Sequence, residues 1–161
     1  MINVIPKTNF IKAVNMIIRR NAAMSHVTRI IQERMSQAGQ KVSIPLIRNG
    51  KSMEVEMTEE GIYVSNLHTS PFLPWDCFEL AVELLRAKGG EAIKGDAMSG
   101  KLGDSKLPID SVEGFIAYKL YDKKIGDSVF RRITPVAAIL IWAGICENAG
   151  KRLVVKENFL V

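Results

Sequence analysis

The residues most able to do chemistry are cations that alternate with aromatic side chains toward the C-terminal end of the chain. Lysine or arginine stands near tyrosine or phenylalanine repeatedly, at Tyr118, Lys119, Tyr121, Lys123, Lys124, Phe130, Arg131 and Arg132. Cations bind phosphates and aromatic rings stack on bases, so this mixture is typical of nucleic-acid-binding surfaces. Asp122 and Asp127 lie within the same stretch, however, and cations near a helix end also serve solubility and the helix dipole.

The positive charge is unevenly distributed along the 161 residues. Lys and Arg number 22 against 17 Asp and Glu, which gives a net charge of +5 and a pI near 9.3. Residues 1–40 hold six of these cations and a single acid, whereas residues 41–161 hold sixteen of each. The excess belongs to the N-terminal segment, and the predicted phosphate contacts draw on both regions: Arg19, Arg20, Arg29, Lys119, Lys123, Lys124, Arg131 and Arg132.

A second stretch, residues 95–102 (GDAMSGKL), is close in spacing to a phosphate-binding loop. In such loops backbone amides surround the phosphates, and a Ser or Thr after the lysine binds Mg²⁺. Here Leu102 takes the place of that hydroxyl, and Gly103 and Asp104 follow where a helix should begin. The preceding segment has a helical pattern instead of a strand pattern. We therefore expect a surface loop and no nucleotide site.

Two acidic positions offer the residue types of a Mg²⁺-dependent nuclease, in which carboxylates and a lysine surround the metal and the cleaved phosphate. They are Asp110 and the Asp122-Lys123-Lys124 run. The segment between them has a helical pattern, and Asp110 also begins an Asp-Ser-Val-Glu capping box. Nuclease activity is therefore the weaker alternative.

The remaining reactive side chains are few. His26 and His68 have no second ligand at a useful spacing, and Cys77 and Cys146 are too few for a disulfide framework or a four-ligand zinc site. We expect both cysteines to be buried thiols within helices. No catalytic residue, metal site or cofactor is assigned, which favours a protein that is not an enzyme.

Residues 10–38 form the longest helical pattern, with Thr8 and Gly39 at positions suited to its caps. Apolar residues from Phe10 through Ile31 to Met35 recur at heptad spacing, with Asn21 at one seam position. This spacing permits a homodimer formed through residues 10–38. The alternative is a break near residues 20–22, which gives two helices that pack on the protein's own domain.

The next segment predicts a three-stranded antiparallel meander over residues 41–67. Asn49-Gly50 favours a two-residue type I′ turn, which pairs Leu46 with Met53, Ile44 with Val55 and Val42 with Met57. Pro45 places the first strand at a sheet edge. A third strand is expected over residues 62–67.

The rest of the chain, residues 70–161, is predicted to be mainly helical with a closing strand. Helical patterns cover residues 75–88 and 110–122, Thr134 and Pro135 begin a last helix that ends before Gly150, and residues 152–160 read as a strand. This order permits a winged-helix-like arrangement in which the helix of residues 110–122 enters the DNA groove.

Together these patterns predict an α+β fold with a basic helical segment, residues 1–40, followed by an α+β domain, residues 41–161. The N-terminus lacks the pattern of a signal peptide, and the apolar stretch of residues 133–146 is too short to span a membrane, so a cytoplasmic location is expected. The leading hypothesis is a non-enzymatic protein that binds nucleic acid through basic helices. The alternative is an assembly module that dimerises through residues 10–38.

Overall fold

A computed structural model of the chain describes residues 26–160, and these adopt the predicted α+β fold. Two antiparallel sheets share one hydrophobic core with four α-helices of this region. The elements follow one another as α2 (His26–Ala38), β1 (Lys41–Pro45), β2 (Ser52–Met57), β3 (Gly61–Val64), β4 (Phe72–Pro74), α3 (Trp75–Ala87), β5 (Glu91–Ile93), α4 (Val112–Leu120), α5 (Ile133–Trp142), β6 (Cys146–Ala149), β7 (Arg152–Val155) and a short 3₁₀ helix, Glu157–Phe159.

The first sheet has the strand order β1-β2-β3-β4, one strand more than predicted. Its extra strand, β4, has only three residues and ends at Pro74, which is why the sequence pattern did not reveal it. The third strand ends at Val64, three residues earlier than expected. β1 lies at the sheet edge, as Pro45 predicted.

The predicted register of the first hairpin is wrong by two residues. Ile44 lies opposite Met53 and Val42 opposite Val55, so the strands are joined by six residues, 46–51, instead of two. A shift of two residues leaves every side chain on its original face, and alternation alone cannot distinguish the two registers. The predicted faces are therefore confirmed: Ile44, Met53 and Val55 are buried, whereas their neighbours along the strands are exposed.

Helix α2 packs on the protein's own domain. Val27, Ile31 and Met35 are fully buried in the core, and the helix contacts β1 and α3. Two residues of the predicted heptad seam, Ile31 and Met35, are thus occupied by intramolecular packing. The cap at Thr8, the seam before residue 26, the break near residues 20–22, and Arg19 and Arg20 lie outside the described residues.

The second sheet has the order β5-β7-β6 and belongs to the run α3-β5-α4-α5-β6-β7. The order of these elements is the same as in a winged helix, but a loop of twelve residues, 121–132, joins α4 to α5 where a helix-turn-helix has a short turn. Two strands were missed. β5 has three residues, and three of the four residues of β6 are exposed. Cys146 lies on β6 and not, as expected, in the last helix, because that helix ends at Trp142 before Gly144.

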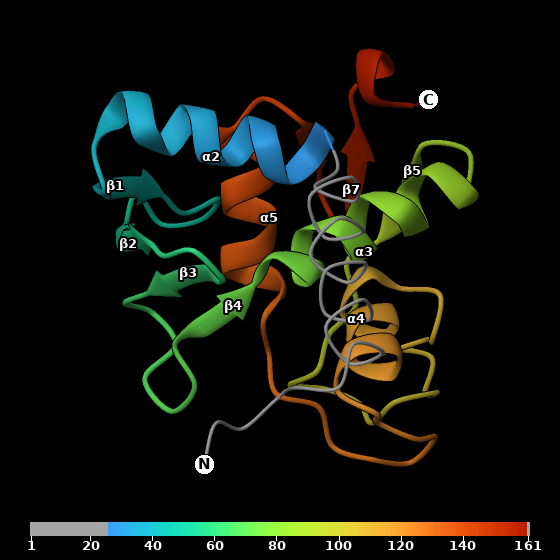
Figure 1. Cartoon of the computed structure of the whole chain (residues 1–161). Coiled ribbons are helices and arrows are strands. Elements are labelled where there is room, and N and C mark those ends of the chain that lie inside the picture. Colours follow the sequence, from blue (N-terminus) through green and yellow to red (C-terminus); the bar gives the residue numbers. More distant parts are fainter. Residues whose placement is uncertain (1–25, 161) are drawn as a thin grey trace, which may run out of the picture.

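In this arrangement α5, and not the predicted helix of residues 110–122, occupies the position of the groove-reading helix. Figure 1 shows α5 standing between the sheet of β1–β4 and helices α3 and α4, with α2 across one end. Seven of its ten residues are buried, because the sequence ITPVAAILIW is apolar on every side. No helix among residues 26–160 is long and apolar enough to cross a membrane.

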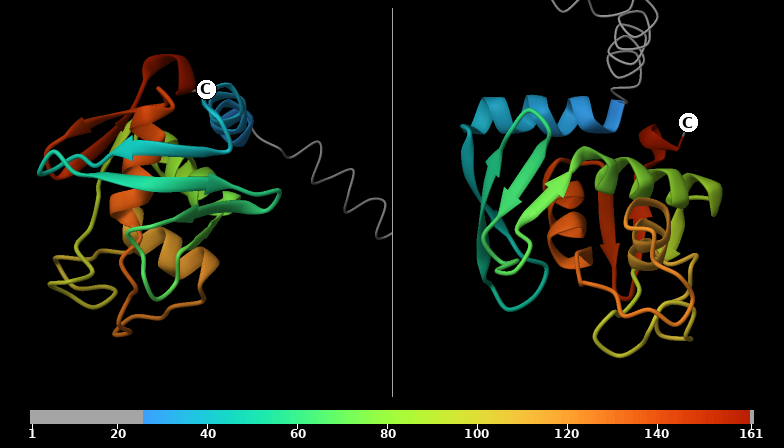
Figure 2. Two further views of the ribbon diagram at one scale, coloured as in Figure 1. Left: turned by 90° about the vertical axis from the view of Figure 1, so that its left-hand side faces the viewer. Right: turned by 60° about the horizontal axis from the view of Figure 1, so that its bottom comes forward.

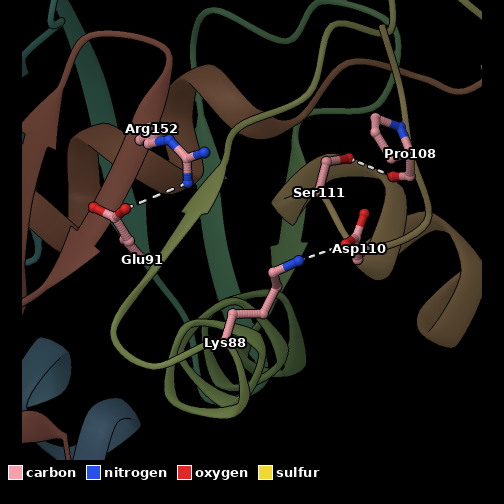
Figure 3. Close-up of polar contacts among 6 residues, drawn as sticks. All are labelled: Lys88, Glu91, Pro108, Asp110, Ser111 and Arg152. Carbon is pink, nitrogen blue, oxygen red and sulfur yellow. Dashed lines mark hydrogen bonds and ion pairs between the residues drawn. The ribbon is translucent and has the colours of Figure 1, made fainter. Parts of the chain in front are cut away.

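The junctions around α4 are fixed by polar contacts (Figure 3). The cap of α4 is Ser111, whose Oγ accepts a hydrogen bond from Gly114 N at 3.1 Å and donates to Pro108 O at 2.6 Å. Asp110 forms an ion pair with Lys88 at the end of α3, and Arg152 on β7 pairs with Glu91 on β5 at 3.4 Å. The predicted capping box at residues 110–113 is therefore wrong, since Glu113 serves another helix.

A basic cleft as the candidate functional site

A cleft of about 1030 Å³ lies where the two sheets meet. Five segments line it: the β1–β2 loop, the β3–β4 loop, the end of β5 with the loop that follows, the start of α5, and the β6–β7 turn. Residues more than 100 positions apart in sequence, such as Arg48 and Lys151, therefore lie around one opening.

Cations dominate the ionisable side chains of this cleft. Six of them line it, one or two from each of its segments except the β3–β4 loop: Arg48, Lys51, Lys94, Lys106, Arg131 and Lys151. Five of the six are exposed, and Lys94 is half-buried. Among the residues that the structure describes, the only carboxylate in the lining is that of Asp96. Within residues 26–160 none of the six cations forms an ion pair, so their charges are available to a ligand.

The β1–β2 loop places Arg48 and Lys51 at the cleft. Leu46 N donates a hydrogen bond to Lys51 O at 2.8 Å, and Asn49 and Gly50 have positive φ values of 71° and 59°. The tip of the loop thus has the positive φ values of the turn predicted from Asn49-Gly50, but the loop contains two further residues, Ile47 and Arg48, before this tip. Both inserted residues line the cleft.

Lys94 is held in place at the end of β5. Its Nζ donates to Gly150 O at 2.7 Å and to Asn148 Oδ1, which ties it to the β6–β7 turn. Burial, with Arg48 nearby, lowers the pKa of Lys94 below its usual value. A phosphate bound here would offset the repulsion between these two cations.

The lone acid, Asp96, serves its own loop. Its Oδ1 accepts a hydrogen bond from Met98 N at 3.0 Å. A hydrogen bond from Ser99, together with the Met98 amide and the charge of Arg131, lowers the pKa of Asp96. The carboxylate therefore stays ionised and shapes the loop, and the six cations of the lining still outnumber this single negative charge.

The buried side chain of Glu113 fixes the start of α5, the helix that lines part of the cleft. This residue is only 1% exposed, and its carboxylate accepts hydrogen bonds from Ile133 N at 2.7 Å and from Arg132 N at 3.0 Å. It therefore caps α5 in place of Thr134, which was predicted to be the cap. Burial raises the pKa of Glu113 to about 7, although the two amides and the arginines nearby favour the charged form.

Arg132 differs from the other predicted phosphate ligands because it is buried. Its guanidinium lies 3.6 Å from the ring centroid of Tyr121 and 4.8 Å from that of Phe130, and the residue is 7% exposed. Its Nη1 donates to Phe130 O at 3.3 Å. This arginine therefore packs the loop before α5 and does not line the cleft.

Of the predicted cations within residues 26–160, only Arg131 lines the cleft. Arg29, Lys119 and Lys124 are exposed elsewhere, and Lys123 is partly exposed. Five cations of the cleft could not be singled out from the sequence, because none lies in a run of more than two cations: Arg48, Lys51, Lys94, Lys106 and Lys151. The one available signal was the pair of turns at Asn49-Gly50 and Gly150, each flanked by cations.

The loop of residues 95–102 does not bind phosphate through its amides. Met98 N and Lys101 N donate instead to the carboxylates of Asp96 and Asp104, and no helix follows. A strand, β5, does precede the loop, which corrects the expected helix. Figure 2 shows this loop and the loop of residues 121–132 side by side, joined through Leu102 and Asp127.

The other candidate chemistries find no geometric support. Asp110 and Asp122 flank opposite ends of α4, whose nine residues span about 13 Å. No cluster of three or more metal-ligating side chains occurs within residues 26–160. His26 stacks on Phe159, while His68 is exposed at the cleft.

Both cysteines are buried free thiols, as expected. Burial raises the pKa of Cys77 to about 11 and that of Cys146 to about 12, so neither is a thiolate near neutral pH.

Comparison of the chain with protein-family models, curated proteins and solved structures gives no match to any of them.

Proposed function

We propose that the protein binds nucleic acid through the basic cleft and acts as a non-enzymatic binding or regulatory protein. The observation that carries this proposal is the gathering of six cations and one carboxylate around a single cleft. Residues 41–161 hold equal numbers of cations and acids, so this concentration does not reflect a generally basic composition. A positive cleft of this kind attracts polyanions and raises their rate of association.

The number and spread of the cations favour a polymer over a small anion. A mononucleotide has fewer negative charges than the cleft has cations, and the volume of about 1030 Å³ is at the upper limit for small-molecule pockets, roughly 300–1,000 Å³. Cations from four separate segments can contact successive phosphates of one strand. Because five of the six are exposed, they can reach phosphates that pass over the opening.

A charge-removal experiment tests this assignment. We expect the triple variant Lys51→Ala/Lys106→Ala/Lys151→Ala to bind a labelled mixed-sequence oligonucleotide about 30-fold more weakly than the unchanged protein, measured by fluorescence anisotropy at about 50 mM salt. All three lysines are exposed and unpaired within residues 26–160, so their removal should not alter the fold.

The chain offers a matched control in Lys119→Ala/Lys123→Ala/Lys124→Ala, which removes the same charge outside the cleft. This control should bind within about threefold of the unchanged protein. Equal losses in both variants would contradict the cleft as the site and return the contacts to the patch at residues 119–124. Absence of binding at micromolar protein would overturn the proposed function itself.

A further inference from the structure

We infer that the nucleic acid bound in the basic cleft is single-stranded, an inference that rests on the proposed function. Two independent features of the structure carry it: the burial of the helix that would read a duplex, and the mixed apolar and cationic lining of the cleft.

The helix in the groove-reading position cannot enter a major groove. Base edges are read by side chains such as Arg, Asn, Gln, Ser and Thr projecting from an exposed helix. The only polar residue of α5 is Thr134, and Val136 through Leu140 are all buried. The sheet of β1–β4 covers the helix, with β1 in contact with it (Figure 1). The chain therefore lacks, at α5, the exposed polar helix surface with which proteins of helix-turn-helix type read duplex DNA.

The same sheet creates a cleft with apolar walls. Leu46 and Ile47 from the β1–β2 loop face a lining that also contains Ile93 and Phe130, and all four are half-buried. Met98, which is 74% exposed, and His68 add to the lining. In a duplex the base faces are stacked on one another, and an apolar wall gains nothing from them. Unpaired bases, by contrast, present their faces to aromatic and apolar side chains.

Charge and apolar surface occur in the same segments of the lining. Arg48 follows Ile47, Lys94 follows Ile93, and Arg131 follows Phe130. A strand lying in the cleft can therefore place its phosphates on the cations and its bases on the neighbouring apolar side chains. This alternation matches the repeating unit of a single strand, in which each phosphate is followed by one exposed base.

Three probes of equal length, about 15 nucleotides, test the inference by anisotropy competition at about 50 mM salt. They are a thymidine oligonucleotide, an abasic oligonucleotide with the same number of phosphates, and a blunt duplex. We expect the thymidine strand to bind at least tenfold more tightly than either of the others. A duplex that binds as tightly as the thymidine strand overturns the inference, and so does an equally tight abasic strand, which would mean that bases contribute nothing. In both cases the proposed function survives, whereas failure of all three probes to bind removes it.

Substitutions in the aromatic lining provide a second readout. Phe130→Leu keeps an apolar side chain beside Arg132 but loses the flat face, and we expect it to weaken binding of the thymidine strand about tenfold while leaving the abasic strand unchanged. His68→Ala, at an exposed position, should weaken binding of the thymidine strand severalfold in the same selective way. If both variants weaken the two strands equally, or neither strand at all, the bases do not stack here and the inference fails.

Discussion

At the scale of single residues, the geometry of the cleft depends most directly on the side chain of Glu113. It is buried, it caps α5, and it sets the position from which Arg131 reaches the cleft. Its raised pKa means that the folded protein holds a proton on Glu113 more tightly than the unfolded chain does. The stability contributed by this proton is fully present below the unfolded pKa of about 4.5 and is lost as the pH rises through 7.

We therefore expect the free energy of unfolding to decrease between pH 5 and pH 8, by about 3 kcal/mol from this residue alone. Glu113→Gln should remove this part of the pH dependence, because the amide does not titrate. Urea denaturation at a series of pH values measures both chains. The assignment is contradicted if the two proteins show the same slope of unfolding free energy over this range.

The sequence placed Glu113 wrongly for a physical reason. The spacing fits a capping box, because a glutamate follows an aspartate by three residues directly before an apolar run. Such a local pattern cannot reveal that the glutamate side chain caps a helix that begins twenty residues later. Arg132 was misassigned in the same way. Its neighbours in sequence suggested a surface patch, while the packing of Tyr121 and Phe130 against it was decided by tertiary contacts.

At the scale of elements, the β1–β2 loop contains residues that serve binding and are not needed for the stability of the hairpin. Its tip already has the positive φ values of a type I′ turn, and Leu46 N bonds Lys51 O across it. When Leu46 and Lys51 are counted as a pair because of this hydrogen bond, Ile47 and Arg48 are the two residues in excess of the shortest hairpin connection. They are half-buried and exposed respectively, and both line the cleft, so the insertion supplies binding residues that the hairpin itself does not require.

Deletion of residues 47–48 should therefore leave a two-residue hairpin whose Pro45–Ser52 pairing is unchanged. We expect the unfolding free energy to stay within about 1 kcal/mol of that of the full chain, since a shorter loop costs less entropy to close. Binding of a single strand should fall about tenfold. Denaturation and anisotropy measured on the same preparation separate the two effects. A chain that is unfolded, or one that binds with unchanged affinity, would contradict this account of the loop.

How well the elements could be predicted depended on their length and on their neighbours. The apolar face of α3, with Phe78, Val82 and Leu85, was predicted correctly because thirteen residues carry a clear period. The faces of β1 and β2 were correct for the same reason. The strands β4, β5 and β6, with three or four residues each, exist because neighbouring strands pair with them, and such pairing leaves little local signal. The cleft depended on those strands, so its residues could not be collected from the sequence.

At the scale of the whole molecule, charge is balanced in number but not in position. Residues 41–161 have no net charge, while six of their sixteen cations line the cleft, from segments far apart in sequence. When such a site binds a strand, its cations replace the counterions condensed on the phosphates of the strand, and these counterions are released.

We therefore expect the association constant for a single strand to fall about 50-fold to 300-fold between about 50 and 200 mM salt, if about four to six phosphates are contacted. Anisotropy titrations at several salt concentrations give the slope. The triple variant Lys51→Ala/Lys106→Ala/Lys151→Ala should show a slope smaller by about two units. A slope that is the same for the variant and the unchanged protein would mean that these lysines contact no phosphate.

The enclosure of α5 has a further consequence for the energetics of binding. One wall of the cleft comes from the first sheet and another from the β6–β7 turn of the second, and α5 packs against β1 on one side and β6 on the other. The two walls are therefore parts of one rigid body, and the cleft exists before any ligand arrives. Binding therefore costs no free energy for assembling the site from the two sheets. The entropy lost on association comes mainly from the ligand, because the preorganised protein restricts rotation about the ligand's backbone bonds.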